Sequence, residues 1–207
     1  MTNKAGNKTT KKISAKQSES LADTGGECAW LTFSPSEVEA ADTFPIVAIG
    51  ASAGGLEALE SFFSNMSAEP GLSFVVIQHL SPGTKSVMKE LLQAKTKMGV
   101  LLVENGIKIE PDKIYVNTPG MQVFLSGRTL RSAEPRSGKA PLFPIDSFFR
   151  SIAENEKEKA VCVILSGTGT DGTLGLKAVK GEGGMVVVQD VNGPNPGLRE
   201  YAWEEKQ

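Results

Sequence analysis

The sequence predicts an α/β domain: a doubly wound, mostly parallel sheet with helices on both faces and a small antiparallel hairpin. Apolar runs of strand length alternate along the chain with amphipathic runs of helix length, which is the pattern of a doubly wound sheet. The two strongest strand candidates, residues 74–77 and 161–165, are continuously apolar rather than alternating. This pattern is typical of parallel strands that are covered on both faces.

The composition is that of one globular domain with tails. The chain has 207 residues, of which 40% are hydrophobic and 22% are charged. The formal net charge of −2 gives no reason to expect a nucleic-acid partner. No apolar run approaches the ~20 residues that span a bilayer, and the polar N-terminus lacks the apolar core of a signal peptide. We therefore expect a cytoplasmic protein without membrane insertion.

The first 43 residues differ from the rest of the chain. Residues 1–43 form a polar leader that we expect to be disordered, because it has too few large apolar groups to offset the entropy lost on ordering. Apolar runs begin at residue 44, which predicts a domain at 44–190 followed by a short tail at 191–207.

Within this domain the elements follow from hydrophobic periodicity. The strands that we expect lie at 46–49, 73–78, 100–103, 113–116, 160–165 and 185–189. The helices that we expect lie at 55–66, 85–97, 145–155 and 173–181. Segment 120–130 contains the turn Ser126-Gly127-Arg128 and predicts a hairpin, whereas 131–144 is rich in Pro, Gly and basic residues and predicts a loop. A further helix is expected to cover the sheet after residue 189, and none is evident, so the C-terminal end looks truncated.

Metal-ligating residues are scarce. One histidine and two scattered cysteines, Cys28 and Cys162, cannot form a four-ligand zinc site. Cys162 lies in an apolar strand, where we expect a small core residue. A magnesium ion bound by carboxylates stays open, although no carboxylates cluster. His79 is the sole histidine, so any imidazole chemistry depends on it.

Three polar residues stand where predicted strands end. Ser52 lies in the turn Gly-Ala-Ser-Ala-Gly-Gly at 50–55, His79 follows the second strand, and Asp171 lies in the glycine-rich loop after the strand that ends at Leu165. Ligands of open α/β sheets bind outside the carboxyl ends of the strands, so one crevice could collect all three side chains. We interpret Ser52 as a nucleophile, His79 as the base that takes its proton, and Asp171 as the carboxylate that orients the imidazole.

Each residue also has a simpler interpretation. Small residues at a strand–helix turn serve packing, a lone histidine at a strand end is commonly structural, and Asp171 could cap the helix that follows it. The loop at 167–172 also matches G-x-G-x-x-G, which leaves a nucleotide site open. The chain order Ser, His, Asp differs from the order in α/β-hydrolases. A triad here would therefore be an independent arrangement.

Five blocks of sequence surround these residues. They read VAIGASAGGLEAL at 47–59, VVIQHLSP at 75–82, IYV at 114–116, PIDSFF at 144–149 and VILSGTGTDGTLGL at 163–176. In this order the blocks resemble the catalytic domain of the chemotaxis protein-glutamate methylesterase CheB, over about residues 44–190. The first and last blocks are similar to the version found in CheB/CheR fusion proteins.

The resemblance implies an enzyme that hydrolyses glutamate γ-methyl esters on methyl-accepting chemotaxis receptors, and that can deamidate glutamine there, during chemotaxis adaptation. The family's triad falls on Ser52, His79 and Asp171. We expect backbone N–H groups to hold the oxyanion: Ala53 at the helix start, and Thr168 or Gly169 in the glycine loop. No metal or organic cofactor is implied. The implied partners are the receptors and a CheR-type methyltransferase. The basic residues Arg128, Arg131, Arg136 and Lys139 could contact an acidic receptor helix, although a solvated loop is the simpler interpretation.

The sequence departs from the family pattern at both ends. The leader is too short and too polar to be the receiver domain that often precedes this domain, so phosphorylation control within the chain is not expected. The family continues past residue 190 with a Gly-Met-Pro segment, a helix and a strand, whereas this chain reads Asn-Gly-Pro-Asn-Pro-Gly at 192–197. The alternative to an active esterase is therefore a catalytically impaired module that binds receptors or acts as a scaffold.

Overall fold

The computed structural model describes residues 44–52, 55–78, 87–134, 143–165, 170–190 and 197–200. All of them belong to the compact unit that spans Glu37–Gln207. The leader predicted at 1–43 lies outside the described residues, so its predicted disorder stays a prediction.

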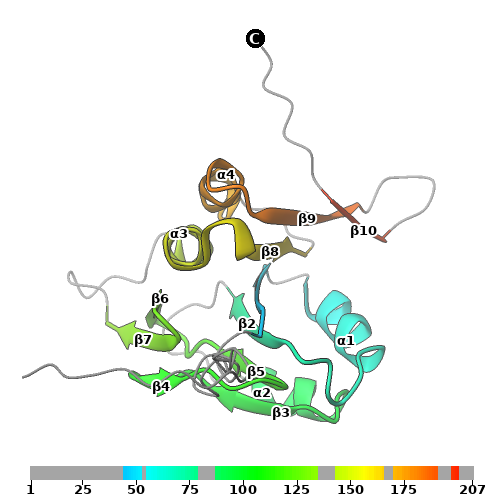
Figure 1. Cartoon of the computed structure of the whole chain (residues 1–207). Coiled ribbons are helices and arrows are strands. Elements are labelled where there is room, and N and C mark those ends of the chain that lie inside the picture. Colours follow the sequence, from blue (N-terminus) through cyan, green and yellow to red (C-terminus); the bar gives the residue numbers. More distant parts are fainter. Residues whose placement is uncertain are drawn as a thin grey trace, which may run out of the picture. The chain divides into compact units, whose positions relative to one another are not determined.

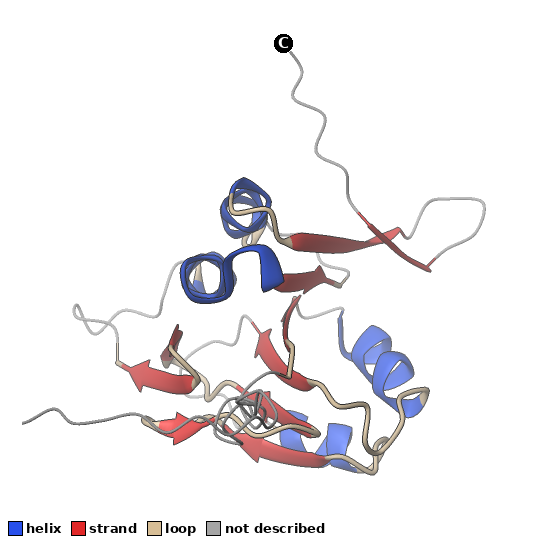
Figure 2. Cartoon of the chain, viewed as in Figure 1, coloured by secondary structure: helices blue, strands red, loops and turns tan. Residues whose placement is uncertain are grey.

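A seven-stranded sheet lies at the centre of this unit (Figures 1 and 2). The strand order is β10-β9-β8-β1-β2-β5-β3, and all neighbouring strands are parallel except β9 and β10. The order reverses at β1, because β2 lies on one side of it and β8 on the other. The bounds are β1 (Ile46–Ala51), β2 (Ser73–Gln78), β3 (Gly99–Leu102), β5 (Lys113–Val116), β8 (Val161–Ile164), β9 (Met185–Asp190) and β10 (Gly197–Glu200).

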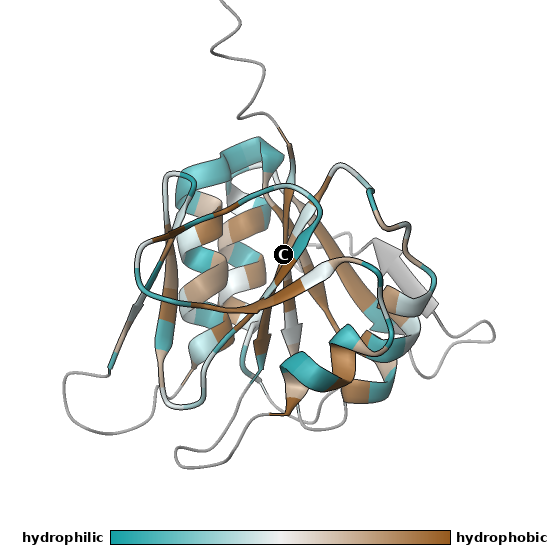
Figure 3. Cartoon of the chain, turned by 90° about the horizontal axis from the view of Figure 1, so that it is seen from below, coloured by the Kyte–Doolittle hydropathy of each residue, from teal (hydrophilic) through white to brown (hydrophobic). Residues whose placement is uncertain are grey.

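Helices cover both faces of this sheet. Helices α1 (Leu56–Ser64) and α2 (Met88–Gln93) pack on one face, and α3 (Pro144–Glu156) and α4 (Thr173–Gly181) pack on the other. Because successive side chains of a strand point to opposite faces, each central strand supplies two cores. In β1, Val47 and Ile49 belong to the core under α1 and α2, whereas Ile46 and Ala48 belong to the core under α3. Figure 3 shows the apolar residues concentrated along the strands.

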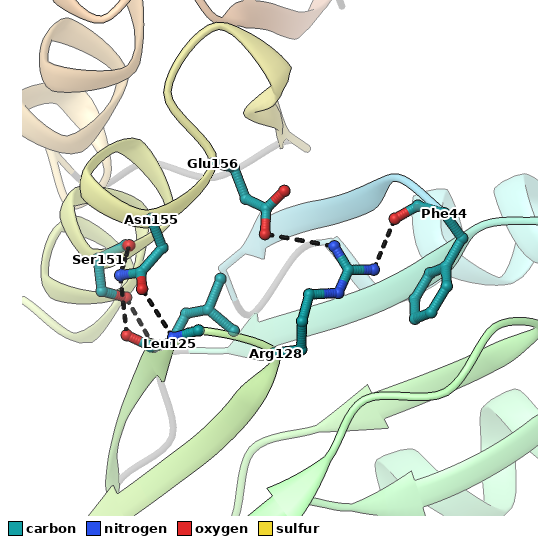
Figure 4. Close-up of polar contacts among 7 residues, drawn as sticks. Phe44, Leu125, Arg128, Ser151, Asn155 and Glu156 are labelled. Atoms are coloured by element: carbon teal, nitrogen blue, oxygen red, sulfur yellow. Dashed lines mark hydrogen bonds and ion pairs between the residues drawn. The ribbon is translucent and has the colours of Figure 1, made fainter. Parts of the chain in front are cut away.

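A second, smaller sheet packs against α3. It is antiparallel and consists of β4 (Ile107–Lys108), β7 (Thr129–Ala133) and β6 (Gln122–Ser126). The Ser151 hydroxyl of α3 accepts the N–H of Leu125 at 2.9 Å. The Asn155 carboxamide accepts the N–H of Gly127 at 2.8 Å and donates to the carbonyl of Leu125 at 3.1 Å (Figure 4). The helix is thereby joined to the hairpin by side-chain bonds as well as by apolar packing.

Arg128, in the turn of this hairpin, joins three segments of the chain (Figure 4). Its Nη2 donates to the carbonyl of Phe44 at 2.6 Å, and its Nη1 lies 3.4 Å from the Glu156 carboxylate. The guanidinium also lies 4.1 Å from the centre of the Phe44 ring, a cation–π distance. The described contacts of Arg128 lie within the domain, and its suggested contact with a receptor stays a prediction. Arg136 and Lys139 lie outside the described residues.

The predicted fold class is confirmed, and several elements have the predicted bounds. Strands at 73–78 and 113–116, the helix at 173–181 and the hairpin turn lie where periodicity placed them. The loop predicted at 131–144 is wrong at its ends, because 131–133 belong to β7 and Pro144 begins α3. Strands β4 and β10 were not predicted. Both are short and lack apolar alternation, so they depend on pairing with the edge of an existing sheet rather than on local preference.

Candidate active site

Three neighbouring strands end at one edge of the large sheet. Strand β1 lies between β8 and β2, with Ala51 opposite Gln78 and Gly50 opposite Ile164. Ser52 is the next residue after β1, and His79 is the next residue after Gln78. In such sheets the crevice outside the strand ends, where the strand order reverses, is the ligand site. The geometry therefore selects the edge at which the sequence placed its three candidates.

Ser52 lies in the turn between β1 and α1. Its carbonyl accepts the N–H of Gly55 at 2.8 Å, and α1 begins at Leu56. Ser52 is half-buried, so the turn fixes the backbone that carries the hydroxyl without enclosing the residue in the core. A serine on a strand–turn–helix corner is a recurring way to present a nucleophile beside helix N–H groups.

Asp171 is anchored at the start of α3. Its carboxylate accepts the N–H of Ile145 at 3.1 Å on Oδ2 and the N–H of Asp146 at 2.9 Å on Oδ1. The first N–H groups of a helix have no partner within the helix, and the helix dipole favours negative charge there. Asp171 therefore caps α3, whereas the sequence had suggested a cap on the helix that follows it. Both bonds leave further lone pairs on the carboxylate oxygens, so the group can still accept a third donor.

A second carboxylate makes the reciprocal connection. Asp146, in the first turn of α3, accepts the N–H of Gly175 in the first turn of α4 at 2.7 Å, and this bond is buried. The helices approach closely because residue 175 is glycine: a Cβ atom there would lie 2.5 Å from Cβ of Phe149. The N-terminus of α3 thus receives the Asp171 carboxylate, and the N-terminus of α4 receives the Asp146 carboxylate. Together the three hydrogen bonds fix the segment that carries Asp171.

Glycines bring this pair of helix ends to the end of β1. A Cβ atom on Gly50 would lie 2.6 Å from Cγ2 of Ile145, and one on Gly172 would lie 3.1 Å from the same atom. Gly172 also has a φ of +103°, which glycine adopts most readily. Ile145 therefore fills the space between β1 and the start of α4, and its own N–H holds Asp171. Because Ile145 both packs against Gly50 of β1 and binds Asp171, the Asp171 carboxylate is held at the same sheet edge as Ser52.

Asn117 is a polar residue at this edge that the sequence interpretation missed. It follows β5, is only 3% exposed, and its carboxamide bonds to both the N–H and the C=O of Gln78, at 2.8 and 3.0 Å. The signal was available, because a polar residue that ends an apolar strand was the criterion that selected Ser52, His79 and Asp171. The backbone of the residue before His79 is thereby fixed by a side chain from the neighbouring strand.

Other predicted site residues fall outside the description. His79 and the predicted oxyanion donors Ala53, Thr168 and Gly169 lie outside the described residues. Within the described ranges no group of three or more His, Cys, Asp or Glu side chains could hold a metal ion. The same part of the chain contains no helix that is long and apolar enough to cross a membrane.

Cys162 is a second potential nucleophile among the described residues. It lies in β8 and is fully buried, as the sequence predicted. Burial raises the pKa of its thiol well above the ordinary value. A buried neutral thiol is inert, because the thiolate is the nucleophile. Of the two residues, Ser52 is the one whose position suits covalent chemistry.

Fold and site together define a class: a doubly wound α/β domain with a serine at the end of its central strand and a carboxylate held at the same edge. The model of the CheB methylesterase family matches residues 47–193. The chain belongs to this family.

Individual relatives agree with this assignment. The chain is 33% identical over 146 residues to "Protein-glutamate methylesterase/protein-glutamine glutaminase 2" of Burkholderia lata. The aligned region covers 70% of this chain and 43% of the relative. It is 42% identical over 103 residues to a 104.1 kDa protein in the hypE 3' region of Rhodobacter capsulatus. That aligned region covers 50% of this chain and 11% of the relative. The crystal structure of the Thermotoga maritima CheB methylesterase catalytic domain superposes with a TM-score of 0.62 at 28% identity, covering 72% of this chain and 82% of that one. The chain thus spans less than half of the two sequence relatives.

Proposed function

We propose that this chain is a protein-glutamate methylesterase that acts in the cytoplasm on methyl-accepting chemotaxis receptors, with Ser52 as nucleophile. The observation that carries the proposal is the sheet edge at which Ser52 follows β1 and Asp171 is held through Ile145, which packs against Gly50 of the same strand. Family membership supplies the reaction class, since the Burkholderia lata relative is named for glutamate methylesterase and glutaminase activity.

The reaction that we propose has two steps. Ser52 Oγ attacks the γ-ester carbonyl while His79 takes its proton, and backbone N–H groups of Ala53 and of Thr168 or Gly169 stabilise the oxyanion. The ester C–O bond breaks, the proton passes from His79 to the leaving oxygen, and methanol departs. Water then loses a proton to His79 and attacks the glutamyl-serine ester, which releases glutamate and restores Ser52. Asp171 holds the imidazole and stabilises its charged form.

Asp171 suits this task because backbone N–H groups orient it before any substrate binds. A carboxylate that already has two fixed donors cannot turn away from the crevice without losing both. The same mechanism applied to a glutamine side chain releases ammonia in place of methanol, which is the deamidation that we propose as a second activity. A CheR-type methyltransferase would supply the methyl ester and is the proposed partner in the cycle.

Methanol release from methylated receptor tests the proposal directly. Wild type is compared with Ser52→Ala and His79→Ala, and we expect each substitution to lower kcat by about 10⁴-fold or more. Equal rates in the three proteins would refute the esterase. Receptor binding by wild type without methanol release would favour the alternative of a binding or scaffold module.

A nucleotide site in the loop at 167–172 is disfavoured by the start of the helix that follows. In such sites the phosphate occupies the helix N-terminus. Here the N–H of Gly175, in the first turn of α4, already bonds to the Asp146 carboxylate at 2.7 Å. A phosphate would have to approach this negative charge in a buried setting. Calorimetric titration with ATP and GTP should therefore give no binding heat.

A further inference from the structure

Asn117 takes over the role of a strand at the end of β5. The parallel ladder between β2 and β5 ends with Val76 opposite Val116, and its last backbone bond runs from the N–H of Asn117 to the carbonyl of Val76 at 3.2 Å. Beyond this point the carboxamide of Asn117 accepts the N–H of Gln78 at 2.8 Å and donates to its C=O at 3.0 Å. A neighbouring strand would satisfy the same two groups. The side chain thus extends the sheet after the main chain of β5 has left it.

Gln78 is consequently held from both sides. Strand β1 pairs with it through Ala51, and Asn117 binds its other edge. Both Gln78 and Asn117 are buried, at 6% and 3% exposure. Because a peptide bond is planar, fixing the carbonyl of Gln78 fixes the plane that includes the nitrogen of the next residue, His79. Only the dihedral angles of His79 itself then remain to be set.

We propose that Asn117 is a positioning residue for His79: it sets the direction in which the chain delivers the imidazole toward Ser52. This inference rests on the proposed function in so far as His79 is taken as the base. It adds a residue to which the triad assigns no task and which would act through the backbone of Gln78. Displacing a catalytic group by about 1 Å can cost 10²-fold in rate, which sets the size of the expected effect.

Asn155 offers a control with the same bonding pattern in the same domain, although it is exposed whereas Asn117 is buried. Asn155 also bonds through its carboxamide to a backbone N–H and a backbone C=O, those of Gly127 and Leu125, at 2.8 and 3.1 Å (Figure 4). It lies at the turn of the hairpin, beside the amino end of β1 rather than the carboxyl end, because Arg128 of that turn binds Phe44. Substitutions at Asn155 therefore remove the same kind of bond without touching the support of His79.

The experiment compares Asn117→Ala and Asn117→Asp with Asn155→Ala and Asn155→Asp. Asp keeps the size of Asn but replaces its N–H donor with an oxygen that faces the carbonyl of Gln78. Circular dichroism first establishes which variants are folded at the assay temperature, and Asn117→Ser replaces Asn117→Ala if the latter is not. We expect kcat to fall about 10²-fold in the Asn117 variants with KM within twofold, and both constants to stay within twofold in the Asn155 variants.

A second readout does not depend on ester hydrolysis. Because the chain has a single histidine, the proton NMR titration of its imidazole reports on His79 without assignment. Asp171→Asn serves as the reference, because it shows how the midpoint of the imidazole titration shifts when a carboxylate partner is lost. In Asn117→Ala we expect the midpoint to move in that same direction, and in Asn155→Ala to stay at the wild-type value.

These readouts separate the two claims. If wild type releases no methanol, the proposed esterase fails, and the titration alone decides the role of Asn117. A folded Asn117→Ala protein with the wild-type titration curve would overturn the inference whatever its rate. A purely structural residue would lower the unfolding temperature and leave this curve unchanged.

Discussion

Replacing Gly175 with alanine should destabilise the domain, although alanine is the better helix former. Gly175 lies in the first turn of α4, where a Cβ atom would stand 2.5 Å from Cβ of Phe149 and 3.2 Å from both Cα and O of Asp146. Cβ and backbone atoms cannot avoid this contact by changing a rotamer. The two helices would have to separate, and the buried bond from Gly175 N–H to the Asp146 carboxylate would lengthen.

The size of the effect follows from opposing terms. Alanine gains about 1 kcal/mol over glycine in a helix interior. Overpacking costs about 1–3 kcal/mol, and weakening a buried hydrogen bond to a charged acceptor costs about 1.5–3 kcal/mol. We therefore expect a net loss of about 1.5–5 kcal/mol in the free energy of unfolding. For a domain of this length a loss of about 3 kcal/mol corresponds to a fall of roughly 6–12 °C in Tm.

The last residue of the same helix provides the control. A Cβ atom on Gly181 would have no neighbour within 4 Å, so Gly181→Ala should gain up to about 1 kcal/mol from helix propensity alone. Urea unfolding of wild type and both variants, with linear extrapolation at a common slope, gives the two differences. Equal stabilisation by both substitutions would show that the close approach of α3 and α4 at Gly175 is not a constraint.

Two further predictions concern stability away from Gly175. Arg128→Lys should lower the free energy of unfolding, measured in urea, by about 1–3 kcal/mol, because an ammonium cannot bond to Glu156 and Phe44 while it stacks on the Phe44 ring. Arg131 is exposed and provides the control. Arg131→Lys should change the free energy of unfolding by less than about 0.5 kcal/mol. Burial raises the pKa of Cys162 and of Tyr115 above their ordinary values of 9.0 and 10.0. Because both groups are neutral in the fold, the contribution of Cys162 is complete below pH 9 and that of Tyr115 below pH 10. Each contribution is lost as pH rises beyond that value, with a limiting slope of about 1.4 kcal/mol per pH unit for each group. Unfolding curves between pH 8 and 11 should show this decline, and Cys162→Ala with Tyr115→Phe should flatten it; an unchanged slope in the double variant would contradict the assignment.

The sequence was most informative where local pattern and global fold agree. Continuous apolar runs identified the central strands because both faces of these strands are covered, and the polar residue after each run marked the sheet edge at which we propose the active site. The same reasoning could have selected Asn117, which ends β5, but nothing in the sequence indicated that its carboxamide would bond to a strand distant in the chain. Strand β10 was missed for a different reason: it pairs with the strand just before it in the chain, β9, but its four residues show no marked β-pattern.

The hydrogen bonds from the start of α3 to Asp171 and from the start of α4 to Asp146 could not be predicted from the sequence. Asp146 reads as an ordinary acidic residue in the first turn of a helix, where the helix dipole favours it, and its actual partner is the N–H of a different helix. Gly175 reads as a weak point of α4, although the structure needs it there for close packing. In both cases the local interpretation is chemically sound. It is incomplete because the packing angle of two helices depends on many side chains at once.

Asp171 combines a structural and a proposed chemical task, and this affects how its variants must be interpreted. Its carboxylate caps α3 through Ile145 and Asp146, so Asp171→Ala removes a cap worth about 1 kcal/mol together with the charge that would orient the imidazole. Asp171→Asn keeps one oxygen acceptor but turns an amide donor toward the other N–H, so it too loses part of the cap. Ser52 differs, because its described hydrogen bond uses the carbonyl, which alanine retains. Ser52→Ala should therefore leave stability nearly unchanged, and its effect on methanol release can be attributed to chemistry alone.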